Sequence, residues 1–285
     1  MTENSDIKIE KVKKKRLSFY QKFVKRFLDV TISFFALVIL SPLFLIIAIL
    51  IKCSMGGKVI FAQYRPGKGC KTFKMYKFKT MTDERDDLGK IKPDKSRITK
   101  LGRFLRKTGL DELPQLYNIL RGDMSIIGPR PRLVKDIIFY SMENREIYSV
   151  RPGLSGPSQV EGGRSTSAWD FIFQTDLRYA KNVTFKKDIS IFFKTIKVLL
   201  KNKDSMASTG ESNRDYYYSD FLLRSGQISK QQYQEGLDKA NQMTSTSAVI
   251  GYQEELHTDL SKHNSESNAM TQLTQEKGEP SNDKN

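Results

Sequence analysis

The chain has 285 residues and a net charge of +16, and this charge is unevenly distributed. Residues 204–285 hold 7 Lys and Arg against 13 Asp and Glu, a net charge of −6, which leaves +22 for residues 1–203. A body this basic must meet an anionic partner, either nucleic acid or an anionic membrane with anionic substrates. Both histidines, His257 and His263, lie in the acidic part, which excludes His-dependent nucleophiles and His-based zinc sites from the body.

The first predicted element is an apolar run that carries no charge from Val30 to Ile51. Its 22 residues could cross a bilayer, but Ser41 and Pro42 interrupt it. A proline inside a helix removes a backbone hydrogen bond, and Ser41 can bond the backbone groups that are set free. Each arm of the broken helix would be roughly 14–16 Å long, about half the thickness of the hydrocarbon core.

The flanks of this run are equally basic. Residues 11–26 contain eight Lys or Arg, and residues 52–79 contain eight more. Since positively charged flanks stay on the cytoplasmic side, both ends favour the same side. We therefore predict a re-entrant helix-break-helix over residues 27–52. A kinked spanning helix and a buried soluble helix are the alternatives. The segment also argues against nucleic acid as the anionic partner, because a nucleic-acid-binding module has no use for an apolar run of bilayer length.

Periodicity and turn residues predict the next elements. In chain order they are a β-hairpin of strands 58–65 and 71–79, a loop over 82–97, a short basic amphipathic helix over 99–107 and a helix over 111–120. Pro114 lies in the first turn of the last helix, where proline is tolerated.

A further basic helix is predicted over residues 186–203. Its apolar stripe lies opposite a face that carries lysines and Ser190, and the stripe comprises Ile189, Phe192, Phe193, Ile196, Leu199 and Leu200. A helix of this kind commonly lies in the membrane interface. The alternative is a core helix with a solvated lysine face.

Residues 204–285 are rich in Ser, Gln, Asn and Glu and poor in periodic apolar residues. We predict an acidic, largely disordered tail here, with short helices around residues 218–240.

The densest group of chemically useful residues is RKTGLDELPQLYNILRGDMSIIGPRP, residues 106–131. Asp111 and Glu112 are adjacent at the predicted start of a helix, with Arg106 upstream and Arg130 held between two prolines downstream. Carboxylates surrounded by arginines suit phosphoryl chemistry, because one carboxylate can attack phosphorus and another can hold Mg²⁺. An Asp-Glu pair at a helix start can equally well serve only to complement the helix dipole.

Several motifs in this order resemble one family. They are KRFLDV (25–30), LSP (40–42), FKTM (78–81), LDELPQLYN (110–118), GDMSIIGPRP (122–131) and RPGLSG (151–156). Together they resemble the bacterial sugar transferases, the monotopic phosphoglycosyl transferases that start surface-glycan synthesis, over roughly residues 22–200. The resemblance implies a membrane-associated α+β fold. This fold combines the re-entrant anchor with a small cytosolic domain that has amphipathic interfacial helices and a short β-hairpin.

The resemblance also implies roles for single residues. Asp111 matches the nucleophile that takes a sugar phosphate from a nucleotide sugar, and Glu112 matches the carboxylate associated with Mg²⁺. Arg106 and Arg130 match phosphate-binding residues. Ser41 and Pro42 match the break of the re-entrant helix.

The implied reaction transfers a sugar 1-phosphate, with UDP as the default carrier, to undecaprenyl phosphate in capsule, exopolysaccharide or related glycan synthesis. The partners are then a nucleotide sugar, undecaprenyl phosphate and membrane lipid, at the cytoplasmic face of a bacterial membrane and without nucleic acid. A homodimer remains an open option.

The resulting organisation is a basic segment 1–26, a membrane helix 27–52, a catalytic domain 53–203 and an acidic tail 204–285. Two other hypotheses compete with this one: a non-catalytic membrane scaffold, and a membrane-tethered nucleic-acid binder.

Overall fold

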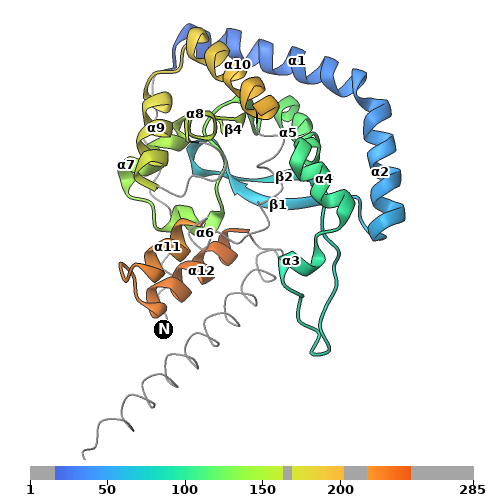
Figure 1. Cartoon of the computed structure of the whole chain (residues 1–285). Helices are drawn as coiled ribbons and strands as arrows, with labels where there is room; N and C mark the ends of the chain where they lie inside the picture. The colour runs from blue at the N-terminus through green and yellow to red at the C-terminus, as the bar shows by residue number, and fades with distance from the viewer. Residues whose placement is uncertain (1–16, 163–168, 202–216, 245–285) are drawn as a thin grey trace, which may run out of the picture.

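The computed structural model describes residues 17–162, 169–201 and 217–244 (Figure 1). The first part of the chain contains η1 (Tyr20–Val24), α1 (Lys25–Ile39), α2 (Ser41–Met55), β1 (Ile60–Pro66), η2 (Lys68–Cys70), β2 (Thr72–Phe78), α3 (Asp94–Arg97), α4 (Lys100–Thr108), η3 (Leu110–Glu112) and α5 (Gln115–Arg121). The second part contains β3 (Ser125–Ile127), α6 (Val134–Ile138), α7 (Met142–Arg145), η4 (Glu146–Ser149), β4 (Gly153–Ser155), α8 (Pro157–Glu161), α9 (Trp169–Lys181), α10 (Phe185–Lys201), α11 (Tyr218–Arg224) and α12 (Lys230–Thr244).

The predicted break in the apolar run is confirmed. Leu40 leaves helical geometry, with φ −87° and ψ 0°, and the helices on either side of it are bent by 61°. Pro42 lies in the first turn of α2, and the Ser41 hydroxyl donates to the carbonyl of Val38 at 2.8 Å. Figure 1 shows α1 along the upper edge of the molecule and α2 turning down its right side.

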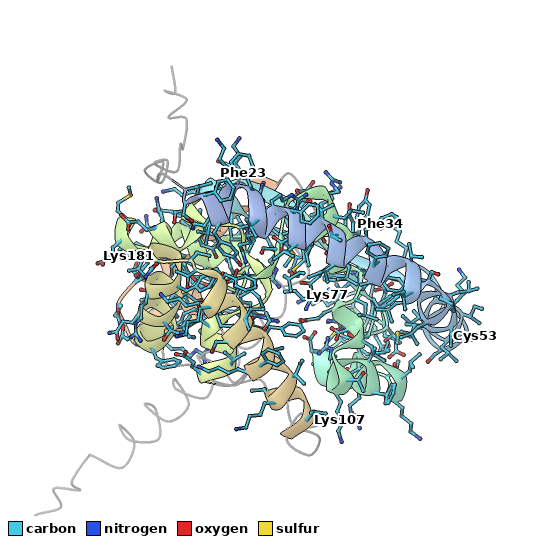
Figure 2. The ribbon with its side chains drawn as sticks, turned by 90° about the horizontal axis from the view of Figure 1, so that it is seen from above. Phe23, Phe34, Cys53, Lys77, Lys107 and Lys181 are labelled. Carbon is cyan, nitrogen blue, oxygen red and sulfur yellow. The ribbon has the colours of Figure 1, made fainter. Side chains whose placement is uncertain are left out.

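The faces of α1 are inverted relative to those of a soluble helix. Asp29 and Ser33 are buried, whereas Phe27, Phe34 and Phe35 are 50–69% exposed. Figure 2 labels Phe34 on α1 and Phe23 on η1, which precedes it. A buried soluble helix would point its phenylalanines inward, so this alternative is wrong.

No single described helix is long and apolar enough to cross a bilayer. The bent pair Tyr20–Ile39 and Ser41–Met55 meets the length and composition criteria only when the two helices are taken together.

The predicted hairpin is confirmed, and it forms the centre of the fold. β1 and β2 are antiparallel, with Ile60 opposite Phe78 and Pro66 opposite Thr72. The buried side of β2 contacts α5 and the inner side of α1 in one core cluster, which contains Phe73, Met75, Leu116, Ile119 and Met124.

Asn118 fixes α5 to the hairpin. This residue is fully buried, its amide group donates to the carbonyl of Lys74 at 2.7 Å, and its side-chain oxygen accepts from the Tyr76 backbone at 3.0 Å. The helix that follows the two candidate carboxylates is thereby fixed against strand β2.

A short parallel pair, β3 and β4, joins the segment after α5 to the segment before α8. Ser125 pairs with Gly153, and Ile127 pairs with Ser155. The two backbones approach so closely that a Cβ atom on Gly128 would lie 2.5 Å from the carbonyl oxygen of Arg151. Only glycine fits at this position.

The predicted helix over residues 186–203 is α10, and its apolar stripe is exposed. Ile189, Phe192, Phe193, Ile196 and Leu200 are 39–65% exposed, whereas Ile191 is buried on the inner side. The core-helix alternative is therefore wrong. Figure 1 shows α10 along the same upper edge of the molecule as α1.

The prediction of short helices around residues 218–240 is confirmed by α11 and α12. These helices also pack against the body at α6 and α9, which was not predicted. Residues 202–216 and 245–285 lie outside the described residues. The docking could not be anticipated, because it depends on polar partners distant in sequence, such as the buried pair of Lys135 and Asp220 at 2.7 Å.

Candidate active site

Asp111 and Glu112 lie in the single 3-10 turn η3 between α4 and α5. The prediction that they begin the helix over 111–120 is therefore wrong in detail, since α5 starts at Gln115. Gly109 has a φ of 74°, a left-handed conformation that ends α4 and starts this turn. The two carboxylates thus project from a tight bend between two packed helices.

The carboxyl group of Asp111 is largely buried, with 8% of the residue exposed. Burial raises the pKa of Asp111 above its ordinary value. The charge of Lys77 lowers this pKa, the neighbouring Glu112 raises it, and Arg106 and Arg130 lower it. The cations therefore partly offset the cost of holding a negative charge at this position.

Glu112 is in a different environment from its neighbour. Its Oε1 atom accepts from Lys77 Nζ at 2.8 Å and from Arg130 at 3.3 Å. One carboxylate oxygen thus accepts from two cationic side chains, which are charge-assisted hydrogen bonds. Asp111 is thus the more buried of the two adjacent carboxylates, and Glu112 is the one that is hydrogen-bonded to Lys77 and Arg130.

Arg106 is oriented by the segment after β2. Its Nε atom donates to the Thr80 hydroxyl at 2.9 Å. Helix α4 can approach this segment because residue 102 is glycine: a Cβ atom there would lie 1.9 Å from the Thr80 carbonyl oxygen. The close approach aligns Arg106 with the strand that carries Lys77.

Arg130 is positioned by the β3–β4 pair. The backbone of Gly128 donates to the carbonyl of Ser155, and Gly153 donates to the carbonyl of Pro129, both at 2.9 Å. The loop that carries Arg130 is therefore anchored on both sides, and the side chain reaches Glu112. All four predicted site residues, Asp111, Glu112, Arg106 and Arg130, come together in the structure.

An open pocket lies beside this group. Its lining includes four cationic side chains, Arg65, Lys77, Arg130 and Arg132, together with Glu112 and Tyr217. In Figure 2, Lys77 lies in the interior of the view, whereas Lys107 projects away from the end of α4. Of the residues predicted from the sequence, Glu112 and Arg130 line this pocket, whereas Asp111, Arg106, Ser41 and Pro42 are not among its lining residues.

Sequence reasoning missed Lys77 and Tyr217. Strand alternation could have indicated Lys77, because Phe73 and Met75 on the same face of β2 are buried. No local signal could have indicated Tyr217, which comes from the segment assigned to the tail.

The two carboxylates have the donor chemistry of a magnesium site whose remaining ligands come from outside the chain. No group of three or more His, Cys, Asp or Glu capable of holding a metal occurs among residues 17–162, 169–201 and 217–244. Mg²⁺ usually binds through one or two carboxylates together with substrate phosphates and water. Glu112 lines the pocket beside Asp111, so one or both of these carboxylates could serve in this way.

Comparison with known proteins identifies the family. The sequence model of the bacterial sugar transferases matches residues 20–202. The chain belongs to the bacterial sugar transferase family. As a member of this family it is an enzyme, a transferase, and the matched region contains every site residue predicted from the sequence.

Three relatives in this family show the range of similarity. The uncharacterized sugar transferase EpsL of Bacillus subtilis is 37% identical over 206 residues, which is 72% of this chain and 98% of that protein. The UDP-N-acetylgalactosamine-undecaprenyl-phosphate N-acetylgalactosaminephosphotransferase of Aeromonas hydrophila is 39% identical over 188 residues, 62% of this chain and 44% of that protein. The UDP-glucose:undecaprenyl-phosphate glucose-1-phosphate transferase of Klebsiella pneumoniae is 36% identical over 185 residues, 60% of this chain and 39% of that protein. The chain therefore spans less than half the length of the latter two.

Proposed function

We propose that this sugar transferase moves a sugar 1-phosphate from a UDP-sugar to undecaprenyl phosphate, with Asp111 as the covalent nucleophile. The observation that carries the proposal is the pairing of a buried Asp111 with a Glu112 already bonded to Lys77 and Arg130. The names of the Aeromonas and Klebsiella relatives also support it, because both contain a UDP-sugar and undecaprenyl phosphate.

The first half-reaction takes place on the donor. A carboxylate oxygen of Asp111 attacks the phosphorus that bears the sugar, and the bond from this phosphorus to the bridging oxygen breaks. UMP leaves with the electron pair, and the enzyme holds an aspartyl phosphosugar. Arg106 and Arg130, whose charges both act on Asp111, would offset the charge of the two phosphates. Mg²⁺ bound at Glu112 would supply further charge neutralisation.

The second half-reaction regenerates the carboxylate. A phosphate oxygen of undecaprenyl phosphate attacks the same phosphorus, and the bond between phosphorus and the Asp111 oxygen breaks. Because UMP departs before the lipid reacts, one pocket serves both substrates in turn. We therefore expect ping-pong kinetics.

The location that suits this chemistry is the cytoplasmic face of the membrane, where the soluble donor and the lipid acceptor can meet. The exposed apolar residues of α1, α2 and α10 support this location, because exposed apolar surface of this extent marks an interaction site. The bend of 61° between α1 and α2, together with the equally basic flanks of the pair, supports a re-entrant anchor.

The test uses membranes that contain the full chain, a panel of UDP-sugars, Mg²⁺ and undecaprenyl phosphate. We expect wild-type protein to release UMP from at least one donor and Asp111→Asn to release it at least about a thousandfold more slowly. Equal release by the two proteins would exclude Asp111 as the nucleophile. No release by inserted wild-type protein from any donor would refute the UDP-sugar reaction.

A further inference from the structure

The helices α11 and α12 lie outside the region that matches the family, which ends at residue 202. They nevertheless pack on α6, the helix that follows the loop of Arg130. Figure 1 shows both helices against α6 at the lower left of the molecule. A segment beyond the family region is thus attached to one wall of the active-site pocket.

A buried polar cluster holds this attachment in one arrangement. Lys135 Nζ of α6 donates to Asp220 Oδ1 at 2.7 Å, and both side chains are under 10% exposed. The Tyr233 hydroxyl donates to the same oxygen at 2.9 Å. One residue further along α6, Asp136 accepts from the backbone and the hydroxyl of Ser219, at 3.1 and 3.0 Å. Buried hydrogen bonds of this kind keep α11 and α12 in contact with α6 and also fix their register on it.

Aromatic packing adds a second attachment at the start of α11. The ring of Tyr218 lies 5.0–5.5 Å, centroid to centroid, from the rings of Tyr140, Trp169 and Phe173. Tyr217 immediately precedes Tyr218 in the chain. The packing of Tyr218 and the hydrogen bonds of Ser219 therefore hold it in place on one side, and α6 lies on its other side. Its ring lies 4.6 Å from Lys135 Nζ.

Tyr217 lines the same pocket as Lys77, Glu112 and Arg130. The same lining contains Arg65, Lys77, Arg130 and Arg132, the cationic groups expected to meet the phosphates. The donor must extend beyond its phosphates in both directions, toward a planar base and toward a sugar. An aromatic ring can stack on either group.

We propose that Tyr217 is a donor-binding residue, supplied to the active site by the C-terminal helical pair, and that its ring contacts the nucleotide sugar beyond the phosphates. This inference rests on the proposed function only in taking the donor to be a UDP-sugar. It assigns a binding role to a segment outside the family region.

The test compares three variants of the full chain. Tyr217→Ala removes the ring, and Tyr217→Phe keeps it. Tyr64→Ala is the matched control, because Tyr64 is half-buried, lies 5.4 Å from the Nζ of Lys74 and is not among the residues that line the pocket. We measure KM for the UDP-sugar, KM for undecaprenyl phosphate, inhibition by UMP and equilibrium binding of the UDP-sugar by calorimetry. Thermal melting verifies that each variant is folded.

We expect Tyr217→Ala to weaken donor KM and donor binding about tenfold, the range of a lost stacking contact, while KM for the lipid stays unchanged. Tyr217→Phe should remain close to wild type. Weaker inhibition by UMP would place the ring on the base, and unchanged inhibition would place it on the sugar. A donor effect no larger than that of Tyr64→Ala, or an effect on lipid KM alone, would overturn the inference.

Measuring donor binding as well as UMP release distinguishes a failure of this inference from a failure of the proposed reaction. Wild-type protein that binds the donor but releases no UMP would refute the reaction, and the Tyr217 comparison would then be decided by calorimetry. Wild-type protein that binds no UDP-sugar would overturn both.

Discussion

Two adjacent carboxylates with different environments are the central feature at the residue scale. Burial raises the pKa of Asp111, and Lys77 is the largest of the effects that oppose this shift. A nucleophilic carboxylate must be ionised, so kcat/KM should fall as the pH drops through this raised pKa. We therefore expect the proposed reaction to depend on Lys77 for activity at the acid end of its pH range.

Lys77→Gln tests this dependence. Loss of the positive charge should raise the pKa of Asp111 further, so the acid limb of kcat/KM against pH should move to higher pH. Lys74→Gln is the control, because Lys74 lies on the opposite face of β2 and is exposed. An acid limb that does not move in Lys77→Gln would contradict the assignment.

The same raised pKa has a consequence for stability. The pKa of Asp111 is higher in the folded than in the unfolded chain, so its ionisation costs folding free energy. This cost develops as the pH rises above the ordinary carboxyl pKa, and it is complete above the raised one. Asp111→Asn should therefore melt at a higher temperature than wild type at pH 8, and the difference should shrink as the pH falls and wild type takes up a proton.

Thermal melts of full-length protein in detergent between pH 5 and pH 8 measure this difference. Asp238→Asn on the exposed side of α12 is the control for the loss of a carboxylate elsewhere. Equal melting of wild type and Asp111→Asn at pH 8 would mean that Asp111 carries no burial cost.

At the scale of elements, Asn118 is the link between α5 and β2. Asn118→Ala removes two buried hydrogen bonds to the strand backbone and leaves the Tyr76 N–H and the Lys74 carbonyl without these partners. We expect the free energy of unfolding to fall by about 2–3 kcal/mol. Urea titration in detergent measures this change, with the exposed Gln231→Ala as control. A loss below about 0.5 kcal/mol, the range of ordinary surface substitutions, would show that packing alone holds α5 in place.

Some of these elements could be predicted from the sequence and others could not, and the difference has a physical cause. The hairpin, α4, α10 and the break at Ser41 and Pro42 follow from alternation, helical periodicity and proline chemistry, which are local properties. The start of α5 was misplaced because Gly109, with its positive φ, inserts a separate turn before the helix. The docking of α11 and α12 could not be predicted, because the partners of Lys135 and Asp136 lie more than 80 residues away.

Some residues of the candidate site could likewise be predicted from the sequence, and others could not. Asp111, Glu112, Arg106 and Arg130 all lie in the region that matches the family, and the first two and Arg130 stand in motifs that are recognisable in the sequence. Strand alternation indicates the face of β2 on which Lys77 lies, whereas Tyr217 required the fold, because the C-terminal helices reach the pocket only through tertiary packing.

At the scale of the whole molecule, the re-entrant anchor predicts that both flanks of the bent pair face the cytoplasm. Cys53, at the end of α2, is exposed, whereas Cys70 is buried. Cys53 can therefore be labelled in the native sequence, and no cysteine has to be introduced. A membrane-impermeant maleimide should label Cys53 in inverted vesicles and leave it unlabelled in intact spheroplasts. Cys53→Ser gives the background from Cys70. Labelling of Cys53 in spheroplasts would instead indicate a kinked spanning helix.

The proposed mechanism depends above all on a covalent bond between Asp111 and the phosphosugar. The most direct measurement is the intact mass of the full chain after incubation with the reactive UDP-sugar and Mg²⁺ in the absence of undecaprenyl phosphate. The account predicts that wild type gains the mass of one sugar phosphate, located at Asp111 by peptide mapping, and releases about one UMP per enzyme. Undecaprenyl phosphate should then remove the adduct, and Asp111→Asn should gain no mass. A wild-type enzyme that turns over with both substrates but never carries the adduct, or carries it on another residue, would contradict the account.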